Sequence, residues 1–219
     1  MLVVYLLIAL VLTGAVVGSC QWAHFRFPGY RIADSNGARI AGRLLNLAFN
    51  LAIVAGMFTV ALTQFGEHLI REGSSYWYEP IVFLLVFDLA YYCLHRTLHR
   101  PVLMRLLHGV HHRIRHPTAM ESLYSHPVDT VIAFTLLFAC MALVGPLGET
   151  SFVVASLLYM VIFGLGHANL DLPFRGMAPL NHWARRHDAH HAQRNVNFGS
   201  ITPVWDWMFG TLPEPARRS

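Results

Sequence analysis

The sequence contains no lysine and carries little charge of either sign. All 16 of its basic residues are arginine, and only 13% of its 219 residues are charged, whereas an ordinary soluble domain has about 25%. Hydrophobic residues make up 55% of the chain, and its mean hydropathy is +0.44. This composition excludes an ordinary soluble domain and predicts an integral membrane protein.

Cysteine is scarce, and the common cofactor motifs are missing. The three cysteines, Cys20, Cys93 and Cys140, lie far apart and form no CxxC pair, which argues against a disulfide framework or a thiolate metal site. Neither GxGxxG, a P-loop nor CxxCH occurs, so no bound dinucleotide, nucleoside triphosphate or covalently attached haem is expected. The arginines lie beside apolar runs instead of on one soluble face, and we therefore expect no nucleic-acid binding.

Five apolar runs are long enough to cross a bilayer, which takes a helix of about 20 residues. They lie at residues 1–19, 44–62, 77–94, 128–144 and 151–166. The first lacks a positively charged start and is long for a cleaved secretion signal, so we expect it to be retained. The sequence thus predicts an all-α, polytopic membrane helical bundle with four or five transmembrane helices.

The placement of arginine predicts the orientation. With five spans, residues 20–43, 95–127 and 167–219 lie on one side and hold 15 of the 16 arginines, while only Arg71 lies on the other. The positive-inside rule makes the arginine-rich side cytoplasmic. Because the avoidance of lysine is typical of a GC-rich bacterial genome, we expect the inner membrane of a bacterium.

Histidine is the abundant functional residue type. The chain has 14 histidines, and 12 of them lie between residues 95 and 191. Spacings of three and four place imidazoles on one helical face, close enough to share a metal ion. One HxxxH pair and two HxxHH groups have these spacings: His95 and His99; His108, His111 and His112; and His187, His190 and His191.

The predicted spans bring these three groups to one side of the membrane. The third span ends at the HxxxH pair, and the fourth and fifth spans form a hairpin that returns the chain to the same side. Eight imidazoles exceed the coordination number of one ion, about four to six, and so suit two ions. Four other histidines lack this spacing, and we assign them to surface or interior roles: His24, His68, His116 and His182.

Asp88 lies within the third apolar run. An unpaired carboxylate there costs about 2.5–3.5 kcal/mol on insertion scales, so it should have a partner. Asp88, Tyr92, His95 and His99 follow at steps of four, three and four and form one helical stripe. We expect Asp88 and Tyr92 to support catalysis by accepting an imidazole N–H and orienting the ring. The alternative is a packing seam in which Asp88 bonds another helix.

The motifs between residues 88 and 211 follow a fixed order. They are Asp88-x-x-Tyr91-Tyr92-x-x-His95-Arg96-x-x-His99, His108-x-x-His111-His112, Ser125-His126-Pro127, His167-Ala168-Asn169, His187-x-x-His190-His191, and Asn197-Phe198-Gly199 with Trp205-Asp206-x-x-Phe209-Gly210-Thr211. In this order they resemble the fatty acid hydroxylase / sterol desaturase superfamily. The resemblance covers residues 77–212, which we take as the hydroxylase-like domain, and residues 1–76 then supply the N-terminal membrane helices.

The resemblance implies an integral-membrane, non-haem di-iron oxygenase whose helices carry a cytosolic, histidine-rich metal-binding cap. It implies that the eight histidines of the three groups are ligands, that His167 is a ninth, and that His126 supports the site. One departure is that the stretch between His167 and His187 lacks a second HxxxH group. The implied cofactors are two iron ions, with dioxygen as co-substrate. Imidazole ligands by themselves would equally admit zinc or copper.

The implied reaction is the hydroxylation or desaturation of a C–H bond of a membrane lipid, such as a fatty acyl chain or a sterol-like molecule. Because the chain has no motif for a redox cofactor, we expect electrons from a separate ferredoxin-like or cytochrome-like protein that docks on the arginine-rich side. The alternative is a non-catalytic membrane protein that binds metal or haem, or a lipid-binding scaffold. A Soret band would identify a haem protein, and polar ligands recurring inside several spans would indicate a metal carrier.

Overall fold

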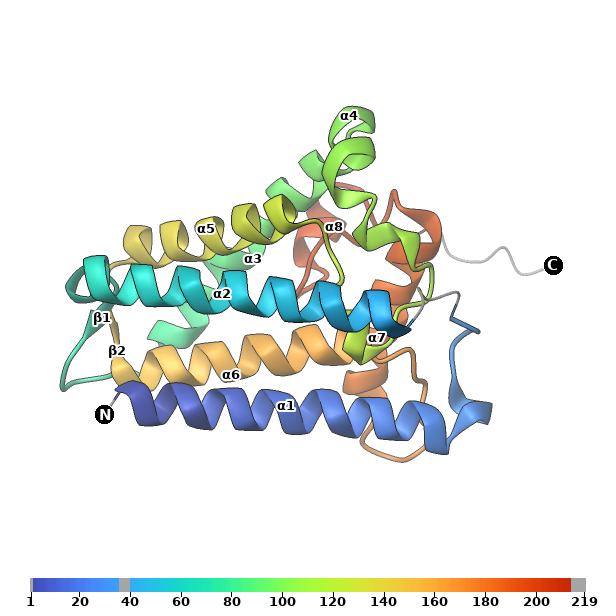
Figure 1. Ribbon diagram of the computed structural model, residues 1–219, viewed down its shortest axis with the longest axis horizontal. Coiled ribbons are helices and arrows are strands. Elements are labelled where there is room, and N and C mark those ends of the chain that lie inside the picture. Colours follow the sequence, from blue (N-terminus) through green and yellow to red (C-terminus); the bar gives the residue numbers. More distant parts are fainter. Residues whose placement is uncertain (1, 36–39, 214–219) are drawn as a thin grey trace.

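Five long helices form the body of the molecule in the computed structural model, which describes residues 2–35 and 40–213 (Figure 1). They are α1 (Leu2–Arg26), α2 (Ile40–Leu69), α3 (Glu79–Leu98), α5 (Pro127–Val144) and α6 (Glu149–Gly166). Each predicted apolar run corresponds to one of these helices, with Met1 lying outside the described residues. The predicted all-α bundle is confirmed.

Four of the helices are long and apolar enough to cross a membrane, within the residues that the structure describes. These segments are Gly42–Leu69, Glu79–Leu98, Pro127–Val144 and Glu149–Gly166. The helix α1 has 25 residues, which gives it a length of roughly 38 Å, and it packs along α6 (Figure 1). The prediction of four or five membrane helices is therefore confirmed, and the protein is an integral membrane protein.

The helices run alternately in opposite directions and gather the loops at two ends (Figure 1). One end is made of residues 99–126 and 167–213, and we call it the cap. Three short or peripheral helices lie within these two ranges: α4 (Pro101–Leu103), α7 (Ala178–Gln193) and α8 (Val204–Met208). Of the arginines that the structure describes, all but Arg71 lie at the cap end, as predicted, while Arg39, Arg217 and Arg218 are outside the described residues.

Two short strands close the opposite end. The strand β1 (Ile70–Arg71) pairs in parallel with β2 (Leu147–Gly148), Ile70 opposite Leu147. The carboxylate of Glu79, at the start of α3, accepts hydrogen bonds from the backbone N–H groups of Tyr76 and Gly148, each at 3.1 Å, and forms an ion pair with Arg71. These bonds fix the ends of α2, α3 and α6 relative to one another.

The core lies between α3, α5 and α6 and is apolar. Its buried side chains include Phe83, Phe87, Met141 and Phe152. A polar contact joins α2 to this core: the fully buried Asn50 donates to the carbonyl oxygen of Ser125 at 3.2 Å and accepts from the hydroxyl of Thr130 at 2.6 Å. In an apolar medium such bonds hold neighbouring helices together.

The chain after α3 leaves the α-helical path, contrary to the helical presentation expected for the second histidine group. Residues Met104–His108 form a π-helical turn, and His111–Arg113 form a 3-10 turn. Gly109 ends the π turn by donating its N–H to the carbonyl oxygen of Met104 at 2.7 Å. A Cβ at this position would overlap that oxygen, so a glycine is needed where the chain turns back toward the bundle.

Candidate metal centre

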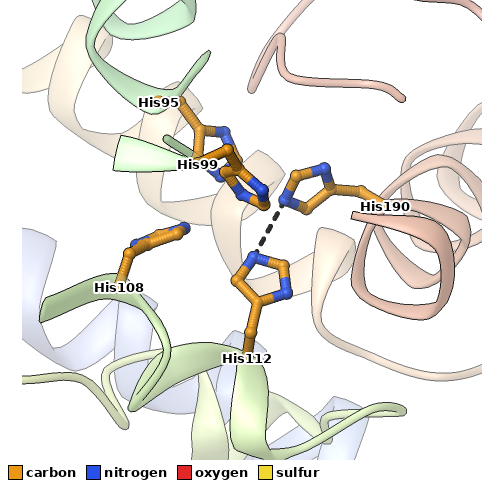
Figure 2. Close-up of side chains that lie close together, drawn as sticks. All are labelled: His95, His99, His108, His112 and His190. Carbon is orange, nitrogen blue, oxygen red and sulfur yellow. Dashed lines mark hydrogen bonds between the residues drawn. The ribbon is translucent and has the colours of Figure 1, made fainter. Parts of the chain in front are cut away.

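The nine predicted ligand histidines lie in two adjoining clusters, to which the end of α3 contributes His95 and the cap contributes the others. In each cluster, one nitrogen of every ring lies within 4.8 Å of the corresponding nitrogens of the other rings. Figure 2 shows the rings of the larger cluster pointing toward one another. The five-histidine cluster contains His95, His99, His108, His112 and His190, and the four-histidine cluster contains His111, His167, His187 and His191.

Each HxxHH group divides between the two clusters. On α7, His187 and His191 belong to the four-histidine cluster, and His190 belongs to the five-histidine cluster. The helical geometry explains this, because positions four apart differ by about 40° around the axis, whereas His190 and His191 differ by about 100°. A single helix therefore supplies histidines to both clusters.

The hydrogen bonds of the rings fix the position of their protons. Five rings donate Nδ1–H to a backbone carbonyl oxygen: His95 to Phe198 (2.9 Å), His111 to Tyr124 (3.0 Å), His167 to Phe163 (2.9 Å), His190 to Val196 (2.7 Å) and His191 to Ile114 (2.8 Å). A carbonyl oxygen can only accept, so in the neutral rings Nε2 carries a lone pair. These lone pairs are the atoms available to a metal.

The lone pairs face one another at short distances. Nε2 of His111 lies 3.1 Å from Nε2 of His191 and 3.5 Å from Nε2 of His167. In the five-histidine cluster, Nε2 of His95 and Nε2 of His99 are buried without a hydrogen-bond partner, and so is that of His108. Buried polar atoms without partners are costly, and facing lone pairs repel unless a cation lies between them. The donor set therefore fits metal ions.

Protonation is the other way to relieve this repulsion, and burial opposes it. Burial, together with the neighbouring imidazoles, lowers the pKa of His111 to about 4. The same causes lower the pKa of His99 to about 3 and that of His167 to about 3. At neutral pH these rings are uncharged, which is the form that binds a metal ion.

Asp88 has partners different from the imidazole that the sequence led us to expect. Its carboxylate accepts five hydrogen bonds of 2.7–3.1 Å from the segment after α7. The donors are the backbone N–H groups of Ser200, Ile201 and Thr202, the Thr202 hydroxyl and the Trp205 indole. Since these donors satisfy both carboxylate oxygens, no histidine bonds Asp88.

Tyr92 likewise bonds no histidine. Its hydroxyl accepts from Arg96 and shares a hydrogen bond with Thr211, both at 3.0 Å. Asp88 and Tyr92 thus hold residues 196–211, which we call the C-terminal loop. The carbonyl oxygens that orient His190 and His95 belong to this loop. Asp88 and Tyr92 therefore act on these two histidines indirectly, by holding the loop.

Asp129 orients one ring of the five-histidine cluster, a contact that the sequence did not reveal. Its carboxylate lies 2.7 Å from Nδ1 of His108. The sequence feature that could have revealed it is the preceding Ser-His-Pro motif. His126 caps the start of α5 by accepting a hydrogen bond from the N–H of Val128 at 3.2 Å, and Asp129 lies in the first turn of this helix. His126 therefore supports the site by starting the helix that carries Asp129.

The histidines that we assigned to non-ligand roles lie outside both clusters. Nδ1 of His116 pairs with Asp188 at 2.8 Å. His182 is exposed on α7, and His24 is buried on α1.

Gly199 lies where the C-terminal loop passes over Asp206. A Cβ there would lie 2.6 Å from the carbonyl oxygen of Thr202 and 2.9 Å from a carboxylate oxygen of Asp206.

We expect Gly199→Ala to lower the free energy of unfolding by about 1–3 kcal/mol and to weaken metal retention by displacing Phe198. Thermal unfolding and metal content in detergent measure this. The control is Gly66→Ala, because a Cβ there meets no atom within 4 Å; equal unfolding temperatures for both variants would refute the crowding at Gly199.

A small cavity adjoins the four-histidine cluster. Its volume is about 20 Å³, room for about one water molecule. Aromatic rings extend from it between α3 and α6, with centroids 5.8 Å apart for Phe87 and Tyr91 and 5.0 Å apart for Phe87 and Tyr159. The cavity is lined by His111, His167 and His187 of that cluster, and by His95, Tyr91, Phe163, Trp183 and Ser200 among others.

The bundle and the two clusters define a class of protein, an integral membrane protein whose cap is suited to hold metal among buried histidines. The sequence profile of the fatty acid hydroxylase family matches residues 80–211, more than half of the chain. The chain belongs to this family. The division into residues 1–76 and 77–212 remains a prediction.

Curated relatives include enzymes of sterol metabolism. The chain is 30% identical over 149 residues to a Delta(7)-sterol 5(6)-desaturase of Leptosphaeria maculans, covering 66% of this chain and 40% of the relative. It is 33% identical over 131 residues to methylsterol monooxygenase 1 of Rattus norvegicus, covering 57% and 43%. It is 29% identical over 174 residues to fatty acid hydroxylase domain-containing protein 2 of Macaca fascicularis, covering 74% and 49%. The chain thus spans less than half the length of these relatives. No solved structure matches it significantly.

Proposed function

We propose that the protein is a membrane-bound, dioxygen-dependent di-iron oxidoreductase that hydroxylates or desaturates a C–H bond of a lipid. The observation that supports this most is the pair of adjoining histidine clusters whose Nε2 lone pairs face one another. The family, and relatives named as a sterol desaturase and a methylsterol monooxygenase, support a lipid substrate such as a sterol-like molecule or a fatty acyl chain.

The two clusters would hold one iron ion each. Five imidazoles would bind the first and four the second, so the second has fewer protein ligands. When bound, the iron pair supplies the activation of dioxygen that an unactivated C–H bond requires and that no side chain provides. The backbone carbonyl groups and Asp129 would orient the ligand rings by accepting their Nδ1–H groups, which such sites need.

The substrate would approach the four-histidine cluster along the aromatic side chains that lie between α3 and α6. Lipids partition into the bilayer, so the membrane itself supplies an apolar substrate to these helices. Tyr91, Phe163 and Trp183 line the cavity at the cluster and would exclude water from the reacting carbon. Because the cavity is too small for a lipid, we expect these side chains to move when the substrate binds.

We also propose that the cap faces the cytoplasm and receives electrons there from a separate ferredoxin-like or cytochrome-like protein. The support for the orientation is the gathering of the described arginines, apart from Arg71, at the cap end, as the positive-inside rule requires. The inner membrane of a bacterium stays a prediction that rests on the lack of lysine.

Comparative lipid mass spectrometry tests the proposed function. Cells that produce the protein and cells that do not are grown under isotopically labelled dioxygen, and iron is measured on the purified protein. We expect two iron ions per chain and a lipid that has gained one labelled oxygen, or lost two hydrogens. Iron-loaded protein that changes no lipid, or a Soret band on the purified protein, would refute the proposal.

A further inference from the structure

A second, larger hollow opens on the surface of the cap, beside the five-histidine cluster. Its volume is about 350 Å³, and three arginines line it: Arg105, Arg113 and Arg194. All three are exposed, and none of the described residues that line the hollow is acidic. We call this hollow the arginine groove.

Acidic side chains of the cap pair with arginines that lie elsewhere. The charged atoms of these pairs lie 2.7–3.1 Å apart, and the pairs are Glu121 with Arg43, Asp171 with Arg185, and Asp206 with Arg186. None of these six residues lines the arginine groove. These three carboxylates are therefore engaged away from the groove, and the groove is lined by three arginines and by no acidic residue among those that the structure describes.

His99 connects the arginine groove to the metal centre. His99 is one of the residues that line the groove, while one of its ring nitrogens belongs to the five-histidine cluster. A second link is Arg194, which donates to the carbonyl oxygen of His112, another member of that cluster, at 3.2 Å. The small cavity, in contrast, meets three members of the four-histidine cluster. The two clusters thus open mainly toward two different surfaces, one cationic and one aromatic.

The rim of the arginine groove suits a protein more than a small anion. The segment of α4 and the following π turn projects from the bundle (Figure 1), and it exposes 66% of Val102 and 62% of Leu106. Met104 and Val110 line the groove itself. Apolar side chains beside arginine are typical of protein interfaces, and a positive patch attracts a negatively charged partner.

We infer that the arginine groove is the docking surface for a one-electron carrier protein whose redox centre is surrounded by carboxylates. The inference rests on the proposed function, in which each turnover consumes one dioxygen, two electrons and two protons. Hydroxylation then yields one alcohol and one water, and desaturation yields one alkene and two waters. Two carrier molecules are each oxidised by one electron. Docking in the groove places the redox centre of the carrier next to His99.

Association kinetics test the docking surface directly. The protein in phosphatidylcholine nanodiscs is mixed with an acidic plant-type ferredoxin or, as a control, with cytochrome c, a basic carrier. We expect Arg105→Glu to lower the association rate of ferredoxin by about tenfold at low salt and less at high salt. Arg175→Glu changes the same charge at an exposed cap position outside the groove and is expected to have little effect.

Several outcomes would overturn the docking surface. They are an unchanged association rate in Arg105→Glu, an equal loss in Arg175→Glu, or cytochrome c binding as well as ferredoxin does. Nanodiscs with added phosphatidylglycerol test a lipid headgroup as the occupant. If Arg105→Glu loses bound phosphatidylglycerol but keeps its ferredoxin association, the groove is a lipid site and the inference is wrong.

Reduction by dithionite separates this inference from the proposed function, because a small reductant needs no docking surface. We expect Arg105→Glu to keep its iron and its dithionite-driven turnover while losing ferredoxin-driven turnover. An unchanged ferredoxin rate beside normal dithionite-driven turnover refutes only the docking surface. Iron-loaded wild-type protein without dithionite-driven turnover refutes the proposed function itself.

Discussion

A His191→Ala variant is expected to lose one of the two iron ions and at least about 100-fold in turnover. The substitution leaves three nitrogens in the four-histidine cluster, fewer than the four that such ions usually take. Weakening a contact that merely orients a ligand typically costs 10–100-fold, so removing the ligand should cost no less. Iron content by elemental analysis and the rate of lipid oxidation measure the two effects.

The neighbouring residue provides a matched comparison. His190→Ala removes an equally buried ring from the same helix, but it leaves four nitrogens in the five-histidine cluster. We expect this variant to keep close to two iron ions per chain, held more weakly, with reduced turnover. His182→Ala, on the exposed face of α7, is expected to change neither quantity. Equal iron loss in His190→Ala and His191→Ala would contradict the division into two clusters.

An Asp88→Ala variant is expected to lose about 3–5 kcal/mol of its free energy of unfolding, the range found when one partner of a buried charged contact is removed. Asp88 is fully buried, and its removal leaves five donor contacts without an acceptor. Because the C-terminal loop carries the carbonyl oxygens that bind His95 and His190, iron should also be lost. Thermal unfolding in detergent and protease sensitivity of the loop report this change.

Two further variants keep the Asp88 prediction testable if Asp88→Ala does not fold. Asp88→Asn retains the size and one acceptor oxygen, so we expect a smaller loss of stability and partial iron retention. The control is Asp171→Ala, since Asp171 pairs with Arg185 on the surface, where the two side chains are 42% and 53% exposed. Such a pair contributes about 1 kcal/mol or less. An Asp88→Ala variant as stable as Asp171→Ala would show that the loop holds its position without Asp88.

The stripe of Asp88, Tyr92, His95 and His99 shows where sequence periodicity reaches its limit. The stripe exists, because all four residues occupy one helix and its end. Periodicity gives the face of a helix but not what packs against that face. The partner of Asp88 lies more than a hundred positions away along the chain, and that loop, not an imidazole, fills the space beside it. The expected bond from Asp88 to a histidine was therefore wrong although the stripe was right.

The amino-acid sequence by itself determined that the chain forms four or five membrane helices, the end of the bundle that carries the histidines, and the eight spaced histidines that meet there, while His167 was added by the family resemblance. It determined them because the thickness of the hydrocarbon layer sets the length of a span, so counting spans places each loop on one side. Only the tertiary structure decided which cluster each histidine joins, which nitrogen faces inward and what Asp88 holds. These depend on the rotation of each helix about its axis and on carbonyl groups of distant segments, and neither is encoded in the spacing of residues along the chain.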